Sequence, residues 1–314
     1  MSASKEAVLL LAHGSPESAA DVPEFMRLVT GGRQVPEPVI DEVKHRYTLI
    51  GRSPLLEITL RQAELLEKKL GLPVYVGMRN WKPFIAEAVQ RMAADGVRRA
   101  AVICLAPQNS RTSVGLYRKA LSSAVAGKNV AVEFIESWHD HPELIRAFSE
   151  RLKTAWETAC GTSGQRLPVI FSAHSVPTRT IEAGDPYEYQ ARNTAELVSK
   201  QVPQLAASEM RFAFQSQGMA REPWLGPTVE ETIAALKNVG HTGVLIQPIG
   251  FLCDHVEVLY DIDIGFKEFA QRHGMRLWRA ESLNESTHLT AALADLAQTA
   301  LHAAKPAVAK VREG

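Results

Sequence analysis

The sequence predicts an α/β protein made of two similar halves, each with a four-stranded parallel sheet flanked by helices, facing a central cleft. Apolar runs of strand length alternate with helical patterns along the 314 residues, an order typical of parallel α/β sheets. The runs are continuous rather than alternating, which suits strands buried on both faces. Four runs precede residue 160 and four follow it, so we place the halves at residues 1–164 and 165–314.

The first half alternates strands and helices in a regular order. Proline opens two of its expected helices, at a position where a missing N–H group is tolerated best. In chain order we expect strand Ala7–His13, helix Leu55–Leu70, strand Pro73–Gly77, helix Pro83–Ala94, strand Ala100–Ala106, helix Thr112–Ala126, strand Val130–Ile135 and helix Pro142–Glu157.

The second half repeats this pattern after a link that we expect at residues 161–165, GTSGQ. In both halves a helix is followed by a glycine-containing turn and an apolar strand, which indicates a weak internal duplication. The expected elements are strand Leu167–Ala173, helix Glu188–Val202, strand Arg211–Phe214, helix Val229–Asn238, strand Gly243–Pro248 and strand Arg276–Trp278.

Composition narrows the classes of partner. The formal net charge is zero, from 35 basic and 35 acidic residues, so nothing suggests nucleic acid as a partner. The apolar runs are too short to span a bilayer, and the N-terminal MSASKEAV lacks the apolar core of a secretory signal. Three scattered cysteines form no disulfide framework and no cysteine metal site. We expect a cytoplasmic monomer with at most peripheral membrane contact.

A histidine ends the first strand of each half. LLAHGSP (10–16) contains His13 and FSAHSVP (171–177) contains His174. The C-terminal edge of an open α/β sheet is where ligands bind, so two facing halves would place one histidine on each wall of a cleft. A neutral imidazole there could accept a proton or bind a metal. The alternative is a hydrogen-bonded structural histidine, which is the commoner case for a lone residue.

Acidic residues follow a buried strand of the second half, in GFLCDHVEVLYDID (250–263). If a helix begins near Asp254 with that residue as its N-cap, Glu257 and Asp261 share one face. The stripe is either solvated or, beside His174, a mixed nitrogen and oxygen ligand set suited to an iron-like divalent ion. The loop QSQGMAREPWLGP (215–227) carries Trp224, which either anchors packing or walls a flat apolar ligand.

Several separated motifs together resemble one family, the ferrochelatases. FSAHSVP and GFLCDHVEVLYD are the most specific of them, and the resemblance covers nearly the whole chain. The other matching stretches are GRQVPEP (32–38), RYTLIGRSPL (46–55), GMRNWKPFI (77–85), LAPQNSRTSVGLY (105–117), GDPY (184–187) and QSQG with PWLGP (215–227).

The resemblance implies two Rossmann-like halves and insertion of Fe²⁺ into a porphyrin during haem biosynthesis, without redox chemistry. His174 and Glu257 match the paired metal-and-proton residues, and Asp261 lies one turn further along the same acidic face. A neutral His174 would take a proton from the ring, while Glu257 would steady positive charge and pass protons outward. The positions that match residues lining or anchoring the porphyrin are Arg46, Tyr47, Ser53, Tyr117 and Trp224.

No cofactor beyond the substrate Fe²⁺ is implied. The C-terminal iron–sulfur cluster of some ferrochelatases has no ligands here, because no cysteine lies beyond Cys253. His13 departs from the family, whose coproporphyrin enzymes mostly carry tyrosine and whose protoporphyrin enzymes tend to carry methionine at this position. HGS in a first strand is instead similar to the sirohydrochlorin and cobalt chelatases, where the histidine serves the metal. We therefore count His13 among the metal residues.

The choice of porphyrin depends on residues 25–52, where the family places the lip of the cleft. This segment lacks an aromatic cluster and contains Arg27, Arg33, Lys44, Arg46 and Arg52. Cationic groups suit the four carboxylates of coproporphyrin III, although Thr30 stands where the coproporphyrin enzymes often have arginine. We favour coproporphyrin III over protoporphyrin IX. Another tetrapyrrole chelatase, for cobalt or sirohydrochlorin, and a porphyrin-binding protein without turnover remain alternatives.

Overall fold

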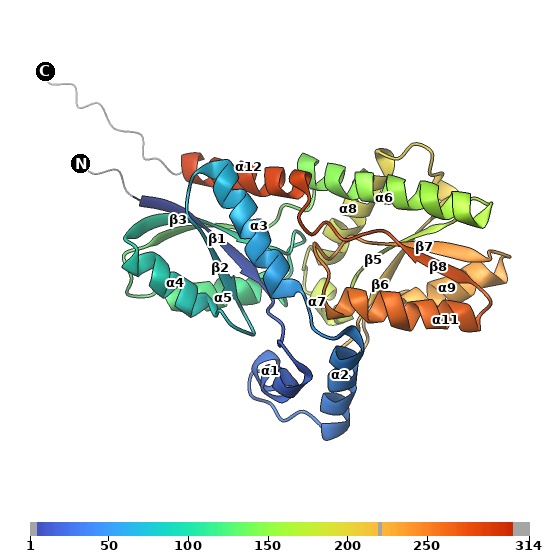
Figure 1. The fold of residues 1–314 in the computed structure, drawn as a ribbon, viewed down its shortest axis with the longest axis horizontal. Coiled ribbons are helices and arrows are strands. Elements are labelled where there is room, and N and C mark those ends of the chain that lie inside the picture. Colours follow the sequence, from blue (N-terminus) through green and yellow to red (C-terminus); the bar gives the residue numbers. More distant parts are fainter. Residues whose placement is uncertain (1–4, 219–221, 304–314) are drawn as a thin grey trace, which may run out of the picture.

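Two four-stranded parallel sheets lie side by side in the structure, which is a computed structural model that describes residues 5–218 and 222–303 (Figure 1). All eight strands lie where continuous apolar runs predict them, which confirms the fold class. The first sheet contains β1 (Lys5–Ala12), β2 (Val74–Met78), β3 (Val97–Cys104) and β4 (Ala131–Ile135). The second sheet contains β5 (Val169–His174), β6 (Met210–Gln215), β7 (Gly243–Pro248) and β8 (Arg276–Arg279).

The two sheets share one strand order. The first runs β2-β1-β3-β4 and the second runs β6-β5-β7-β8, with every pair parallel. In both, the first strand is internal, and the chain passes to one side of it and then to the other. This reversal is the switch point beside which open α/β sheets bind ligands. His13 directly follows β1 and His174 is the last residue of β5, so both histidines stand at such a point.

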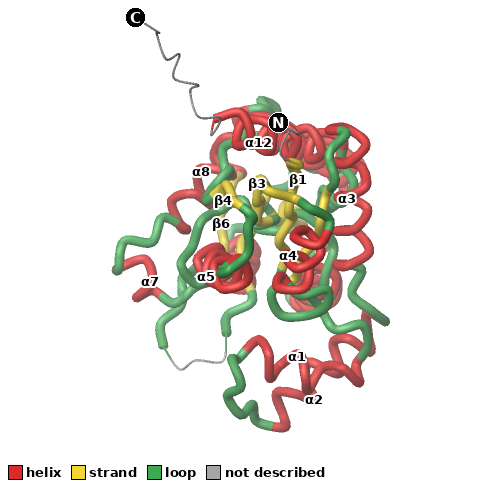
Figure 2. Tube along the Cα trace, turned by 90° about the vertical axis from the view of Figure 1, so that its left-hand side faces the viewer, coloured by secondary structure: helices red, strands yellow, loops and turns green. Residues whose placement is uncertain are grey.

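Helices cover both faces of the sheets and add a small unit beyond them. Figure 2 shows α1 and α2 set apart from the strands, on the side opposite α12. The helices of the first half are α1 (Val22–Val29), α2 (Glu37–Ile50), α3 (Leu55–Leu70), α4 (Ile85–Ala94), α5 (Val114–Val125) and α6 (Pro142–Ser163). The later ones are α7 (Thr178–Glu182), α8 (Tyr187–Lys200), α9 (Val229–Asn238), α10 (Val256–Leu259), α11 (Lys267–Arg272) and α12 (Thr287–Ala303).

Two long helices cross between the halves. α6 packs on β7, β8 and α8 of the second half, whereas α12 packs on β3, β4 and α3 of the first half and also contacts α6. One continuous apolar core therefore includes Val8 and Leu10 from β1 together with Val169 and Phe171 from β5. α6 continues to Ser163, so the expected link at residues 161–165 is wrong in its first three residues.

α1 and α2 form a separate small core. Val22, Phe25 and Met26 of α1 are buried against Tyr47 of α2, with Val256 of the second half packed against the same cluster. The amphipathic pattern of α1 thus turns its apolar face inward, toward the sheets. Within the described residues, no helix combines the length and apolarity that crossing a membrane requires.

Candidate functional site

His174 and Glu257 form the centre of the site. The Nε2 atom of His174 lies 3.5 Å from Oε1 of Glu257, and the two side chains are 38% and 33% exposed. The other ring nitrogen, Nδ1, lies 2.5 Å from the carbonyl oxygen of Ser175 and donates to it. Because that carbonyl occupies Nδ1, the ring turns Nε2 toward the carboxylate. The hydroxyl of Tyr187, from the GDPY motif, donates to the carbonyl of His174 at 2.8 Å and fixes the end of β5.

The segment that carries Glu257 begins later than its sequence suggests. α10 starts at Val256 and His255 is its N-cap, so the prediction of Asp254 as the N-cap is wrong. The Asp254 carboxylate is used elsewhere: it accepts hydrogen bonds from Ser282 at 2.7 Å and Asn284 at 2.9 Å and pairs with Arg279. Gln215, beside His174 in the sheet, donates to the carbonyl of Glu257 at 2.9 Å and ties α10 to that edge.

Asp261 lies one turn beyond Glu257, where the helix widens into a π-helical turn at Asp261–Phe266. The Ser216 hydroxyl donates to its carboxylate at 2.5 Å, and Arg46 of α2 donates to the other oxygen at 3.2 Å. Arg46 also pairs with Glu42, and its guanidinium lies over the ring of Tyr260. The predicted acidic row is therefore not freely solvated, because a first-half arginine and a second-half serine hold its outer member.

His13 lies at the matching edge of the first sheet. Its Nδ1 donates to the carbonyl of Gly14 at 3.0 Å, and its Nε2 accepts from the side chain of Asn80 at 3.0 Å. The ring also makes an edge contact with Phe25 of α1. The two hydrogen bonds specify one neutral tautomer of the imidazole, with an unprotonated Nε2.

The two strand-end histidines differ in charge. Burial and the nearby Arg79 lower the pKa of His13, which leaves it neutral at pH 7. Burial would also lower the pKa of His174, but the charge and hydrogen bonding of Glu257 outweigh it and raise that pKa to about 9. Burial opposes ionisation of Glu257, yet His174 holds the pKa of this carboxyl well below its usual range. In the site without iron, the prediction of a neutral His174 is therefore wrong.

Asp261 titrates in a different range from Glu257. Burial and the negative charge of Glu257 raise the pKa of Asp261 to about 6, against the opposing effects of Ser216 and Arg46. Two carboxyls one turn apart thus have pKa values on opposite sides of the ordinary one. Such a separation of pKa values is typical of groups that transfer protons at near-neutral pH.

The five predicted porphyrin residues lie at different depths. Tyr47 and Tyr117 are buried, Arg46 and Trp224 are half-buried, and the Tyr47 hydroxyl is hydrogen-bonded to Ser15 at 2.8 Å. Ser53 accepts a long local hydrogen bond, 3.4 Å from the amide of Leu55. The Trp224 ring packs so closely on Gly218 that a Cβ there would lie 2.6 Å from it. Of the five, Arg46 is joined directly to Asp261 by a hydrogen bond.

Three residues that contact the predicted metal residues had no role assigned from sequence. His255 lies inside the DHVE motif, and its Nε2 is 3.6 Å from the second oxygen of Glu257. Asn80 and Tyr187 belong to GMRNWKPFI and GDPY and contact His13 and His174. All three fall in motifs that the sequence singles out, and the partners of Asn80 and Tyr187 lie 67 and 13 positions away in the chain. No group of three or more histidine, cysteine or acidic residues in the described ranges is arranged to enclose a metal.

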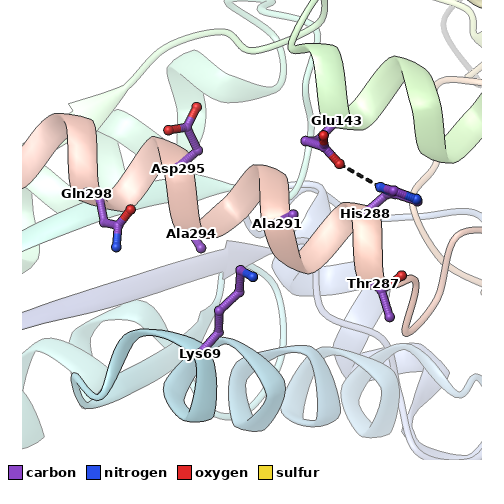
Figure 3. A pocket seen from close by; sticks show the side chains of 8 residues that line it. All are labelled: Lys69, Glu143, Thr287, His288, Ala291, Ala294, Asp295 and Gln298. Carbon is purple, nitrogen blue, oxygen red and sulfur yellow. Dashed lines mark hydrogen bonds and ion pairs between the residues drawn. The ribbon is translucent and has the colours of Figure 1, made fainter.

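One hollow of the described surface lies away from these residues. It has a volume of about 570 Å³ between α3, α6 and α12 (Figure 3). None of its lining residues is a predicted site residue. His288 of α12 and Glu143 of α6 both line it and pair at 2.6 Å, and His288 also pairs with Glu150 of α6 at 3.2 Å. The contacts tie together the two helices that cross between the halves.

Comparison with known proteins agrees with the motifs. The family model described as Ferrochelatase matches residues 5–301. The chain is 54% identical to a ferrochelatase of Acidobacterium capsulatum, over 95% of each chain. It is 36% identical to a coproporphyrin III ferrochelatase of Geobacillus thermodenitrificans, over 91% of this chain and 93% of the relative.

A solved structure shares the fold at low identity. SirB of Bacillus subtilis, determined with Fe³⁺, has a TM-score of 0.59 and 12% identity, over 94% of this chain and 95% of its own. This likeness shows the two-sheet fold alone. The family model and the relatives cover nearly the whole chain, including every residue of the His174 and Glu257 site. The chain belongs to the ferrochelatase family, enzymes of haem biosynthesis that insert iron into porphyrins.

Proposed function

We propose that this protein inserts Fe²⁺ into coproporphyrin III, with His174 and Glu257 as the metal and proton residues. The observation that carries the proposal is the ion pair between them at the C-terminal edge of the second sheet, 3.5 Å apart and partly open to solvent. One nitrogen and one carboxylate leave most positions on an iron ion free. An ion held by few ligands can be captured and then released to the porphyrin.

The protonation state of His174 decides whether the pair can bind iron or accept a proton. At neutral pH the imidazole is charged, so it must lose this proton before it can bind Fe²⁺ or accept a proton from the pyrrole nitrogens. The positive charge of arriving iron favours that loss. Glu257 is ionised and Asp261 has a pKa of about 6, so the two carboxylates supply successive acceptors away from the ring. Arg46 and Ser216 would orient the outer acceptor.

His13 would face the porphyrin from the first half. Its neutral tautomer has a lone pair on Nε2, which Asn80 occupies through a hydrogen bond. Imidazole nitrogen is a good ligand for iron, so His13 is the proposed axial ligand of the product. A ligand from this sheet would approach iron from the side opposite His174.

The preference for coproporphyrin III is supported by the inward packing of the largest apolar side chains of α1, whereas Leu49 of α2 is 49% exposed. Phe25 and Met26 are each only 8% exposed, and they pack inward rather than toward a membrane surface. The basic residues of the segment support the proposal less than the sequence suggests. Arg27, Lys44 and Arg52 pair with Glu24, Asp41 and Glu57, so a porphyrin carboxylate would have to compete for them. The curated relatives include enzymes named for coproporphyrin III.

We further propose a cytoplasmic monomer that needs no iron–sulfur cluster or other cofactor. Anaerobic kinetics with both porphyrins test the substrate, with detergent only where protoporphyrin IX requires it. We expect a kcat/KM at least about tenfold higher for coproporphyrin III. This ratio is the effect of one charge-assisted contact to an additional carboxylate. A higher kcat/KM for protoporphyrin IX would contradict the substrate but not the insertion of iron.

A further inference from the structure

We propose that Arg79 binds a carboxylate of the porphyrin from beside His13. The inference rests on the proposed function and adds a specificity residue to it. Arg79 directly follows β2, and two backbone hydrogen bonds fix this segment to the end of β1. The amide of Arg79 donates to the carbonyl of Ala12, and the amide of Asn80 donates to that of His13, both at 2.9 Å. The arginine is therefore held at the same sheet edge as His13.

Arg79 has no acidic partner within the described ranges of the chain. By contrast, Arg27, Arg46 and Arg52 each lie within 3.2 Å of a carboxylate oxygen. The Nε–H group of Arg79 is buried and donates to no partner, which leaves part of the guanidinium unsatisfied. A partly buried cation without an anion is costly, so its presence at a binding edge indicates that the ligand supplies the anion.

Tyr117 places the guanidinium among the proposed porphyrin residues. The Arg79 guanidinium carbon lies 5.4 Å from the centre of the Tyr117 ring, over its face. Stacking on an aromatic ring leaves the N–H edge of a guanidinium free to bind a carboxylate with two parallel hydrogen bonds. Tyr117 is 4% exposed, so the ring is a fixed support for the arginine.

Electrostatics favours a carboxylate over a neutral group at this position. An unbalanced positive charge beside His13 repels Fe²⁺, and the repulsion weakens when an anion neutralises the guanidinium. Coproporphyrin III and protoporphyrin IX both bring carboxylates, and the former brings more of them. A bound porphyrin would thus remove a barrier to the second substrate as well as gain a contact. The alternative is that Arg79 only packs on Tyr117, in which case its loss would affect stability and not charge recognition.

The test measures binding of metal-free coproporphyrin III by quenching of its fluorescence, and compares it with the uncharged tetramethyl ester in the same detergent. Arg79→Gln should raise the Kd of the acid about tenfold or more, because it removes a charge-assisted hydrogen-bonding group. The Kd of the ester should stay unchanged. Arg98→Gln is the matched control, since Arg98 is an exposed arginine at the start of β3, and it should change neither value.

Equal Kd values for coproporphyrin III in wild type and Arg79→Gln would overturn the inference. An equal rise in the Kd of the tetramethyl ester would overturn it as well. If Arg79→Gln does not fold, Arg79→Lys decides. Lysine keeps the charge but not the planar, two-pronged guanidinium, so we expect the Kd of coproporphyrin III to rise about threefold and that of the ester to stay unchanged. An unchanged Kd for the acid in this variant overturns the two-bond contact. Iron insertion by the wild type is scored separately, so failure of the proposed function stays distinguishable.

Discussion

Equivalent residues at the ends of two equivalent strands carry different charges. His13 is held neutral by its bonds to Gly14 and Asn80, while His174 is held charged by Glu257. The sequence shows the repeated Ala-His but not this difference, because the deciding partners lie 67 and 83 positions away. Local spacing does not encode contacts of that range. The positions of the two histidines could be predicted, whereas their protonation required the structure.

The charge of His174 can be measured by NMR titration of the iron-free protein. We expect a pKa above 6.5 in the wild type and a lower one in Glu257→Gln, which removes the neighbouring negative charge. Because the folded pKa exceeds the unfolded one, the pair stabilises the fold below about pH 6.5, and this contribution is lost as the pH rises through about 9. Glu42→Gln is the control, since Glu42 contacts Arg46 and not His174. An unchanged pKa in Glu257→Gln would contradict the account.

Glu257 and Asp261, the two carboxylates of the proposed proton path, should differ in their effect on the rate of iron insertion. Glu257 pairs directly with His174, while Asp261 is held further out by Ser216 and Arg46. An amide keeps the shape of the side chain but cannot accept a proton. We expect Glu257→Gln to lower the insertion rate by about 100-fold or more and Asp261→Asn by about tenfold or less, in anaerobic assays at saturating substrate. A larger effect of Asp261→Asn than of Glu257→Gln would contradict this order and place Asp261 next to the porphyrin ring.

At the scale of elements, strands could be predicted more reliably than the helix that carries the carboxylates. β7 appears in the structure with the bounds that its apolar run predicts. The helix expected from Asp254 instead starts at Val256, because Asp254 binds the Arg279 and Asn284 side chains. The π-helical turn at Asp261–Phe266 leaves no pattern that distinguishes it from an α-helix. Side chains remote in sequence set both features.

The loop after β7 should control the position of His174. A Cβ added at Gly250 would lie 3.0 Å from both Cα and Cβ of Ala173 and 3.5 Å from the amide of His174. Gly250→Ala should displace the end of β5, lower the insertion rate about tenfold and cost about 1–3 kcal/mol of stability. Gly265→Ala is the control, because a Cβ there meets only the carbonyl of Tyr260 at 3.7 Å. Equal rates in the two variants would show that the close packing on β5 does not position the histidine.

At the scale of the whole molecule, the crossing of α6 and α12 joins the halves into one core. The chain order assigns α6 to the first half and α12 to the second, but each packs on the opposite sheet. A count of strands predicts two halves, and it carries no information on which sheet a flanking helix covers. This exchange makes the relative position of the two sheet edges depend on α6 and α12. His13 and His174, two of the proposed metal residues, lie at those edges.

The link between these helices can be tested by thermal unfolding. His288→Ala removes the contact of α12 with Glu143 of α6, which Figure 3 shows, and a second contact with Glu150. We expect a loss of about 1 kcal/mol, as is typical of a partly exposed polar pair. His302→Ala, an exposed histidine at the end of the same helix, should change stability much less. If both variants unfold alike, the histidine does not join the helices.

The central claim is that His174 at the edge of the second sheet carries iron insertion. Its most direct test is a single-turnover, anaerobic reaction of coproporphyrin III and Fe²⁺ with excess enzyme, followed by the porphyrin absorbance bands. We predict conversion to the iron product by the wild type. His174→Ala should show no insertion above the uncatalysed rate, with an unchanged circular dichroism spectrum and unchanged porphyrin binding. Near-normal conversion by the folded His174→Ala variant would contradict the account.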